Sequence, residues 1–259
     1  MRISMQRFML LTPILLFISL ACSLLTGGGE IVHPLDNENN MPFEPATPTA
    51  TAVPPTEKPA NIPSTATSTA VPQKFFKEEF DANSKPDNWA YFIASGDDSN
   101  FTIEQKNDGL IFDLGSRDLY VYYLYEGQVY ENAALTLVAE NRGVNKNNVS
   151  LVCRLDYENA EWYEYSFDSG GLWALWAYQD GYNLLDNGGS NSLKQGLAVN
   201  EYAMTCDGND ITMYVNGEKL KTYTDRKYFF IDGQVGFNIS SFDFLPVTVK
   251  VKSFDIADP

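Results

Sequence analysis

Carboxylates are the side chains of this 259-residue chain that could carry acid–base or metal chemistry. The one histidine, His33, lies in a Pro/Thr-rich segment, which excludes His-based triads and His-containing zinc sites from the rest of the chain. Asp156, Glu158 and Glu161 are closely spaced, and a calcium site or an acid/base pair is one interpretation of them. Because Asn159-Ala160 should form a turn between two strands, we predict an exposed acidic turn instead, with no catalytic residue and no cofactor other than this alternative calcium ion.

Aromatic rings offer a second kind of chemistry, because flat rings stack on the apolar faces of sugars. Five rings close together in the sequence are candidate glycan-binding residues: Trp162, Trp173, Trp176, Tyr178 and Tyr182. The alternative is a place in the core, since Trp173 and Trp176 face opposite sides of a strand and at least one of them should be buried. A second strip with the same ambiguity comprises Tyr120, Tyr122 and Tyr123.

The elements that position these residues are predicted to be short strands. Runs rich in Val, Ile, Tyr, Phe and Thr are separated by Gly, Asn and Asp clusters, and no segment has a sustained 3.6-residue period. The predicted strands are Phe101 to Gln105, Leu110 to Leu114, Tyr120 to Tyr125, Ala133 to Glu140, Val149 to Tyr157, Trp162 to Phe167, Leu172 to Tyr178, Glu201 to Cys206, Ile211 to Val215, Lys219 to Tyr223, Gln234 to Asn238 and Val247 to Ile256.

Turn residues between these runs predict hairpins. Asn216-Gly217 follows the alternating run Ile211, Met213, Val215, which is typical of a half-buried antiparallel strand that enters a tight turn. About a dozen strands at this spacing favour an all-β fold, a two-sheet antiparallel jelly-roll sandwich over residues 74–259, rather than a small barrel or separate domains.

The charge of the chain is strongly acidic, with 18 Lys plus Arg against 34 Asp plus Glu and a net charge of −16. Such a surface repels phosphate backbones, whose binding depends on basic residues that release counterions. A nucleic-acid partner is therefore excluded, whereas neutral ligands such as glycans are compatible with this charge.

The amino terminus has the pattern of a signal peptide over residues 1–22, with Arg2 and Arg7 before an apolar stretch that ends at Ala21. Ile18-Ser19-Leu20-Ala21-Cys22 resembles the lipobox of bacterial lipoproteins, although Ser19 replaces the large aliphatic residue usual three places before the cysteine. The resemblance implies lipid attachment at Cys22 and a membrane anchor at the bacterial cell surface. An ordinary signal peptide or an uncleaved anchor is the alternative.

Residues 23–73 are predicted to be a disordered linker. Their densest part, TPTATAVPPTEKPANIPSTATSTAVP, is nearly all Thr, Ala, Pro and Ser. Pro fixes φ and withholds a backbone donor, so such a segment populates extended conformations rather than packing into a core. The expected role is that of a stalk between the membrane and the folded domain.

Four segments of the folded part carry a resemblance to a known family. They are SLVCRLDYENAEWYEYSFDSGGLWALWAYQDG, NEYAMTCDGNDITMYVNGEKL, GQVGFN and VTVKVKSFDI. Together they are similar to the concanavalin A-like or laminin G-like jelly rolls that bacterial surface lipoproteins carry behind Thr/Pro linkers. The resemblance covers residues 75–257 and implies the fold, while the architecture serves lectins, hydrolases and adhesion modules alike.

Two cysteines remain if Cys22 is lipidated. Cys153 and Cys206 both lie in predicted strands of an exported domain, so a disulfide between them is a hypothesis and two buried free thiols are the alternative. The corresponding strands of the related lipoproteins look paired in the same way, which supports the disulfide.

Two enzyme classes share this architecture. Laminarinase-type hydrolases use a strand motif E-x-D-x-x-E, but Glu79-Phe80-Asp81 leads to Ser84 at the last position, and Asp156, Glu158 and Glu161 have the first two acids exchanged. Domains similar to 3-keto-disaccharide hydrolases are also related jelly rolls, and the signals of an active site are missing here as well.

We therefore expect a lipid-anchored surface protein with a non-catalytic carbohydrate-binding or adhesion domain, whose partner is a carbohydrate or a cell-envelope glycan. A divergent secreted glycan hydrolase and a purely structural cell-envelope module are the alternatives.

Overall fold

The computed structural model describes residues 73–143 and 146–259. The predicted signal peptide, Cys22, His33 and all but the last residue of the predicted linker lie outside the described residues. Within the described part of the chain, no helix is long and apolar enough to cross a membrane. The described residues are almost entirely strands and loops, with one short 3-10 turn at Asp98–Asn100.

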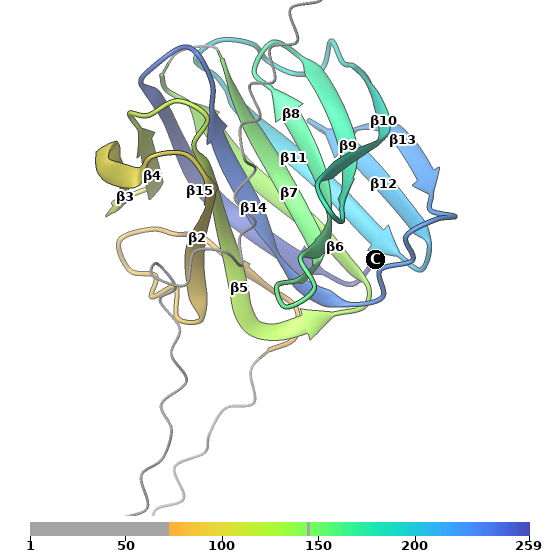
Figure 1. The fold of residues 1–259 in the computed structure, drawn as a ribbon. Helices are drawn as coiled ribbons and strands as arrows, with labels where there is room; N and C mark the ends of the chain where they lie inside the picture. The colour runs from red at the N-terminus through yellow and green to blue at the C-terminus, as the bar shows by residue number, and fades with distance from the viewer. Residues whose placement is uncertain (1–72, 144–145) are drawn as a thin grey trace, which may run out of the picture. The chain divides into compact units, whose positions relative to one another are not determined.

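The strands form two antiparallel sheets that stack face to face (Figure 1). The eight-stranded sheet has the order β13 (Glu218–Thr224), β12 (Asp210–Val215), β11 (Val199–Asp207), β6 (Ala133–Asn141), β15 (Val247–Ala257), β4 (Gly109–Leu114) and β3 (Phe101–Lys106), with β1 (Phe76–Glu78) also paired to β15. The seven-stranded sheet has the order β10 (Tyr182–Gly189), β9 (Leu172–Tyr178), β8 (Glu161–Asp168), β7 (Asn147–Asp156), β14 (Gly233–Ser241), β5 (Tyr120–Tyr130) and β2 (Trp89–Ser95).

The core lies between the two sheets and follows from the two-residue period of the strands. On β8, Tyr163, Tyr165 and Phe167 point into the core, and Met213 of β12 and Leu137 of β6 are among the residues that belong to the same cluster from the opposite sheet. Each of these five side chains is at most 1% exposed. Full burial of an apolar side chain of this size contributes roughly 1.5–3 kcal/mol, so this interface holds the sandwich together.

The predicted fold class and the twelve predicted strands are confirmed, and they correspond to β3–β9 and β11–β15. Asn216 and Gly217, with φ of 48° and 79°, form the predicted tight turn between β12 and β13. Three strands were not predicted. β1 has only three residues, β2 is apolar without alternation, and β10 (YNLLDNGG) is rich in turn-forming Asn, Asp and Gly.

The predicted disulfide is also present, and it joins the two layers of the sandwich. Cys153 lies on β7 of the seven-stranded sheet and Cys206 on β11 of the eight-stranded sheet, and their sulfur atoms are bonded. Both side chains are 1% exposed and belong to the core. The alternative of two free thiols is therefore wrong.

Candidate functional site

The outer face of the seven-stranded sheet, which points away from the eight-stranded sheet, carries a second cluster of buried rings. One face of an antiparallel sheet is ordinarily solvated and polar. Here the outer face instead holds a hydrophobic cluster of its own, formed by Tyr122, Leu124, Val152, Leu155, Ala160, Trp162 and Tyr178. This outer face is the candidate functional site, because its apolar side chains form a cluster separate from the core between the sheets. Apolar clusters on the outside of a fold often mark binding sites.

A carboxylate lies at the centre of the outer face. Glu164 of β8 is 3% exposed and is paired in register with Val152 of β7 and Trp176 of β9. Its Oε2 accepts hydrogen bonds from the Tyr122 hydroxyl at 2.6 Å, from Trp162 Nε1 at 3.3 Å and from the Tyr182 hydroxyl at 3.3 Å. Among the residues the structure describes, these three hydrogen bonds all reach Oε2.

Burial sets the electrostatics of this group. Burial raises the pKa of the Glu164 carboxyl, and the hydrogen bonds from Tyr122, Trp162 and Tyr182, together with the nearby Ser150 hydroxyl, only partly offset it. Burial also raises the pKa of Tyr122 and Tyr182 well above the ordinary tyrosine range, and the nearby charge of Glu164 adds to this. Both hydroxyls therefore stay protonated and act as donors to the carboxylate.

Rings surround Glu164 in stacked and edge-on pairs. Trp162 stacks on Tyr178 with ring centroids 3.8 Å apart, and Tyr182 lies edge-on to Tyr178 at 5.0 Å and to Trp176 at 5.8 Å. Tyr182 is 37% exposed and Trp176 is half-buried, whereas Trp162 and Tyr178 are buried. Of these four rings, Trp176 and Tyr182 are thus the accessible ones. The buried pair Trp162 and Tyr178 packs against Tyr182.

Four of the five candidate glycan-binding residues come together on the outer face: Trp162, Trp176, Tyr178 and Tyr182. Trp173 does not join them, because it faces the core between the sheets and is 6% exposed. The prediction that Trp173 and Trp176 face opposite sides of their strand is confirmed. In the second strip, Tyr120 and Tyr122 lie on the outer face and Tyr123 in the core.

Two of the three acidic residues at the β7–β8 turn, Asp156 and Glu161, accept hydrogen bonds within the chain. Asp156 Oδ1 accepts from the backbone N–H groups of Glu158 and Asn159, and its Oδ2 accepts from the Asn159 amide at 2.7 Å. Glu161 accepts from the Gln179 amide at 2.5 Å. In the described ranges, no group of three or more acidic, His or Cys side chains is placed to hold a metal ion.

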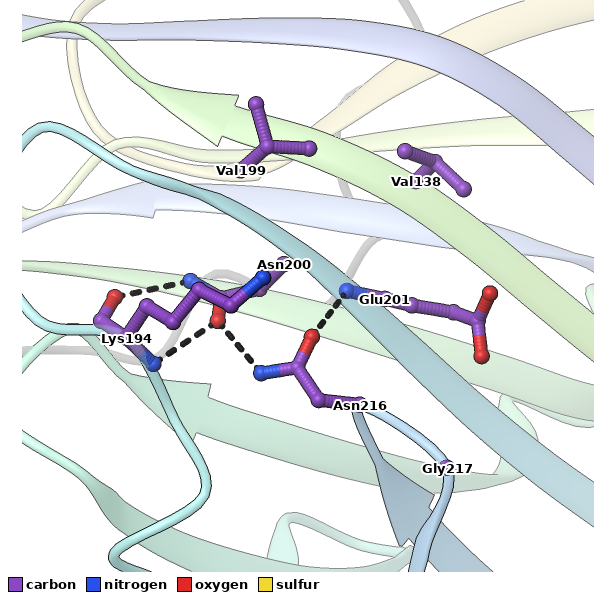
Figure 2. A pocket seen from close by; sticks show the side chains of 7 residues that line it. All are labelled: Val138, Lys194, Val199, Asn200, Glu201, Asn216 and Gly217. Atoms are coloured by element: carbon purple, nitrogen blue, oxygen red, sulfur yellow. Dashed lines mark hydrogen bonds between the residues drawn. The ribbon is translucent and has the colours of Figure 1, made fainter.

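The eight-stranded sheet has a depression of about 420 Å³ near one edge, shown in Figure 2. Its amide side chains bond to one another and to the backbone. Asn200 Oδ1 accepts from Asn216 Nδ2 at 2.7 Å and from the Lys194 N–H at 2.9 Å, while Asn216 Oδ1 accepts from the Glu201 N–H at 2.9 Å. These contacts fix the loop before β11 against the β12–β13 turn, so the amides are structural.

Sequence reasoning missed Glu164, the buried carboxylate of the outer face. The alternation in EWYEYSFD (161–168) was the available signal, since Tyr163, Tyr165 and Phe167 belong to the core and Glu164 must then face outward. Nothing in the sequence indicates that Tyr122, 42 residues earlier, contacts this carboxylate.

The chain matches no protein-family model and no curated protein. Among solved structures, it is similar to a Bacillus subtilis protein of unknown function with a galectin-like fold, with a TM-score of 0.57 and 11% identity over 71% of this chain and 94% of that chain. A β-glucanase of Bacillus licheniformis has a TM-score of 0.55 and 13% identity, covering 73% of this chain and 100% of that one.

A glycoside hydrolase family 16 endo-glucanase from Bacteroides ovatus has a TM-score of 0.53 and 10% identity, with 70% of this chain and 99% of that chain covered. Similarity at such low identity concerns the fold alone. The described domain is a concanavalin A-like jelly roll, as the resemblance in the sequence implied.

Proposed function

We propose that the protein is a non-catalytic carbohydrate-binding protein that holds a glycan on the outer face of its seven-stranded sheet. The observation that carries the proposal is the half-exposed pair Trp176 and Tyr182 beside the buried carboxylate of Glu164. Sugar rings need apolar platforms for their C–H faces and fixed polar groups for their hydroxyls, and this face has both. The structural likeness to two glucan-acting enzymes is consistent with it.

Among the described residues, no second carboxylate lies beside Glu164 on the outer side of β8, which supports a binding role. Retaining glycosidases need two carboxyl groups about 5–5.5 Å apart, and inverting enzymes need about 6.5–9.5 Å. On β8, the outward positions on either side of Glu164 are Trp162 and Ser166. Within the described residues, none of the groups that shift the pKa of Glu164 is a second carboxylate.

A binding screen tests the proposal. The full chain, solubilised in mild detergent, is incubated with insoluble and immobilised polysaccharides, and both retained protein and released reducing sugar are measured. We expect retention without release, and an at least tenfold loss of affinity in Trp176→Ala. Phe244→Ala is the control, because it removes a more accessible ring, 57% exposed, from the β14–β15 loop, away from this face. Equal retention of the two variants would contradict this location for the site.

A glycan hydrolase is the second candidate function. The observation that favours it is the raised pKa of Glu164, since a general acid must hold its proton near neutral pH. Release of reducing sugar that Glu164→Gln abolishes would establish this alternative. Failure of every glycan both to bind and to be cleaved would favour a structural module of the cell envelope.

We further propose that the protein is exported and anchored through a lipid on Cys22, so that residues 23–73 act as a stalk for the jelly roll. The lipobox-like sequence Ile18-Ser19-Leu20-Ala21-Cys22 supports this. Metabolic labelling with a fatty-acid probe should mark the wild-type chain, and Cys22→Ser should lose the label. A labelled Cys22→Ser chain, or an unlabelled wild-type chain, would contradict lipidation at this residue.

A further inference from the structure

The connection between β13 and β14, loop 225–232, displays two large apolar side chains at one end of the sandwich. Phe229 is 52% exposed and Ile231 is 70% exposed, whereas Phe230 between them is buried and packs in the core. Val129, the next-to-last residue of β5, is 58% exposed, and β5 ends where β14 begins (Figure 1). Large apolar side chains that gather at one exposed end of a fold often mark an interaction surface.

Loop 225–232 is fixed by buried polar groups. Asp225 is 2% exposed, and its carboxylate accepts hydrogen bonds from three successive backbone N–H groups, the last of them that of Phe229 at 2.5 Å. Arg154 Nη1 donates to the carbonyl oxygen of Phe230 at 2.8 Å. Phe229 has a φ of 55°, a left-handed conformation that is unfavourable for a residue with a side chain. These contacts hold the exposed side chains in place, which lowers the entropy lost when they bind a partner.

The predicted linker joins the domain at the same end. Gln73 is its last residue, and the carbonyl oxygen of the following Lys74 accepts a hydrogen bond from the Tyr130 hydroxyl at 2.7 Å. Tyr130 is the last residue of β5 and lies next to the start of β14. Residues 23–73 separate this point from Cys22, the proposed site of lipid attachment. A tether raises the local concentration of lipid around the domain, so contacts too weak to bind a free domain can hold a tethered one.

The charges at this end do not favour an anionic partner. Exposed carboxylates offset two exposed basic residues of the loop: Asp207, Glu131 and Asp232 against Arg226 and Lys227. Burial lowers the pKa of Arg154 and the charges of Glu131 and Asp207 counteract this, so both carboxylates lie near this end. The apolar side chains therefore have to supply the affinity, and the apolar interior of a bilayer is the partner that fits them.

We propose that loop 225–232 docks on the lipid bilayer to which the chain is anchored, with Phe229 and Ile231 inserted at the boundary between headgroups and acyl chains. The inference rests on the proposed lipid attachment at Cys22 and adds a second contact with the membrane. The lipid holds the chain at the bilayer, and the loop orients the domain. Because the loop lies at the ends of the strands, the docked domain keeps the outer face of the seven-stranded sheet open to a glycan.

The test places the full lipidated chain in phosphatidylcholine vesicles, with or without bromine on the acyl chains, and measures tryptophan fluorescence. Phe229→Trp puts a reporter in the loop. Phe244→Trp is the matched control, because Phe244 is 57% exposed and follows β14 at the opposite end of the sandwich. After subtraction of the wild-type signal, we expect brominated lipid to quench roughly half of the Phe229→Trp reporter fluorescence and little of the Phe244→Trp fluorescence. Addition of Ile231→Asp to Phe229→Trp should abolish this quenching, because a carboxylate is costly to place among acyl chains.

Vesicle flotation of the wild type separates this inference from the proposal on which it rests. A wild-type chain that does not float with the vesicles contradicts the lipid anchor, and the docking inference falls with it. A chain that floats but is quenched equally in Phe229→Trp and Phe244→Trp is anchored without docking, which overturns the inference alone. Quenching of Phe229→Trp that requires anionic lipid would assign the contact to Arg226 and Lys227, and would overturn docking by apolar insertion.

Discussion

The buried carboxylate of Glu164 makes the stability of the protein depend on pH. Its pKa in the folded chain is raised, chiefly by burial, above the ordinary value of 4.5. The folded state therefore binds this proton more tightly than the unfolded state, and the associated stability is present below pH 4.5 and lost as the pH rises through the folded pKa.

Glu164→Gln removes this titration while it keeps an oxygen that can accept from Tyr122. We expect the wild type to lose stability relative to Glu164→Gln as the pH is raised from about 4.5 to 8. Urea unfolding of both proteins at several pH values measures the difference, and the subtraction cancels the titration of all other groups. A constant difference across this range would show that Glu164 does not titrate there.

Trp173 and Trp176 differ in what their removal should do. Trp173 packs in the core, so Trp173→Ala should cost about 3–5 kcal/mol through lost burial and a residual cavity. Trp176 is half-buried and donates from Nε1 to the Ser166 hydroxyl at 3.1 Å, so Trp176→Ala should cost clearly less while it weakens glycan binding. Thermal unfolding of the two variants provides the comparison. Equal losses would mean that Trp176 is mainly a structural residue.

At the scale of elements, the disulfide holds β7 against β11 across the core. Cys153 and Cys206 are separated by 53 residues, and closing a loop of this length should stabilise the fold by roughly 4 kcal/mol in the chain-entropy model. The double variant Cys153→Ala/Cys206→Ala should lose about 2–4 kcal/mol. Urea unfolding of the wild type with and without reductant gives a matched check. If reductant also lowered the unfolding midpoint of the double variant, the loss could not be assigned to this bond.

The strands that could be predicted from the sequence are those in which local signals agree. β12 alternates Ile211, Met213 and Val215 and ends at Asn216-Gly217, so its type, its face and its turn all follow from the sequence. β10 could not be predicted, because its Asn, Asp and Gly residues favour turns and its strand conformation is imposed by pairing with β9.

The candidate site likewise has features that could be predicted from the sequence and features that could not. The rings of β8 and β9 and their alternation are local properties, and they placed Trp173 and Trp176 on opposite faces correctly. The hydrogen bonds between Glu164, Tyr122 and Tyr182 are not local, because they join β8 to β5 and β10 across the sheet. The order of the strands in the sheet decides which polar side chains meet, and alternation within single strands does not determine that order.

At the scale of the whole molecule, Arg154 connects loops from both sheets at one end of the sandwich. A β-bulge at a register shift in β7 gives this residue a φ of 54° and aims its side chain out of the ladder. The guanidinium donates to Glu131 O at 3.0 Å, to Phe230 O at 2.8 Å and to Gly208 O at 2.6 Å. These carbonyls belong to the β5–β6, β13–β14 and β11–β12 connections. The first two of these connections lead from one sheet to the other.

Arg154→Met should therefore destabilise the whole fold by roughly 3 kcal/mol or more, because it leaves these three carbonyl oxygens without their donor. Arg154→Lys should recover little, since one ammonium group cannot donate in the directions that the planar guanidinium serves. Arg142→Met is the control, because among the described residues that exposed side chain forms one ion pair, with Glu140 at 3.8 Å, and its loss should cost at most about 1 kcal/mol. Urea midpoints measured with the disulfide intact decide the matter. Similar midpoints for Arg154→Met and Arg142→Met would mean that the loops hold the end of the sandwich without this residue.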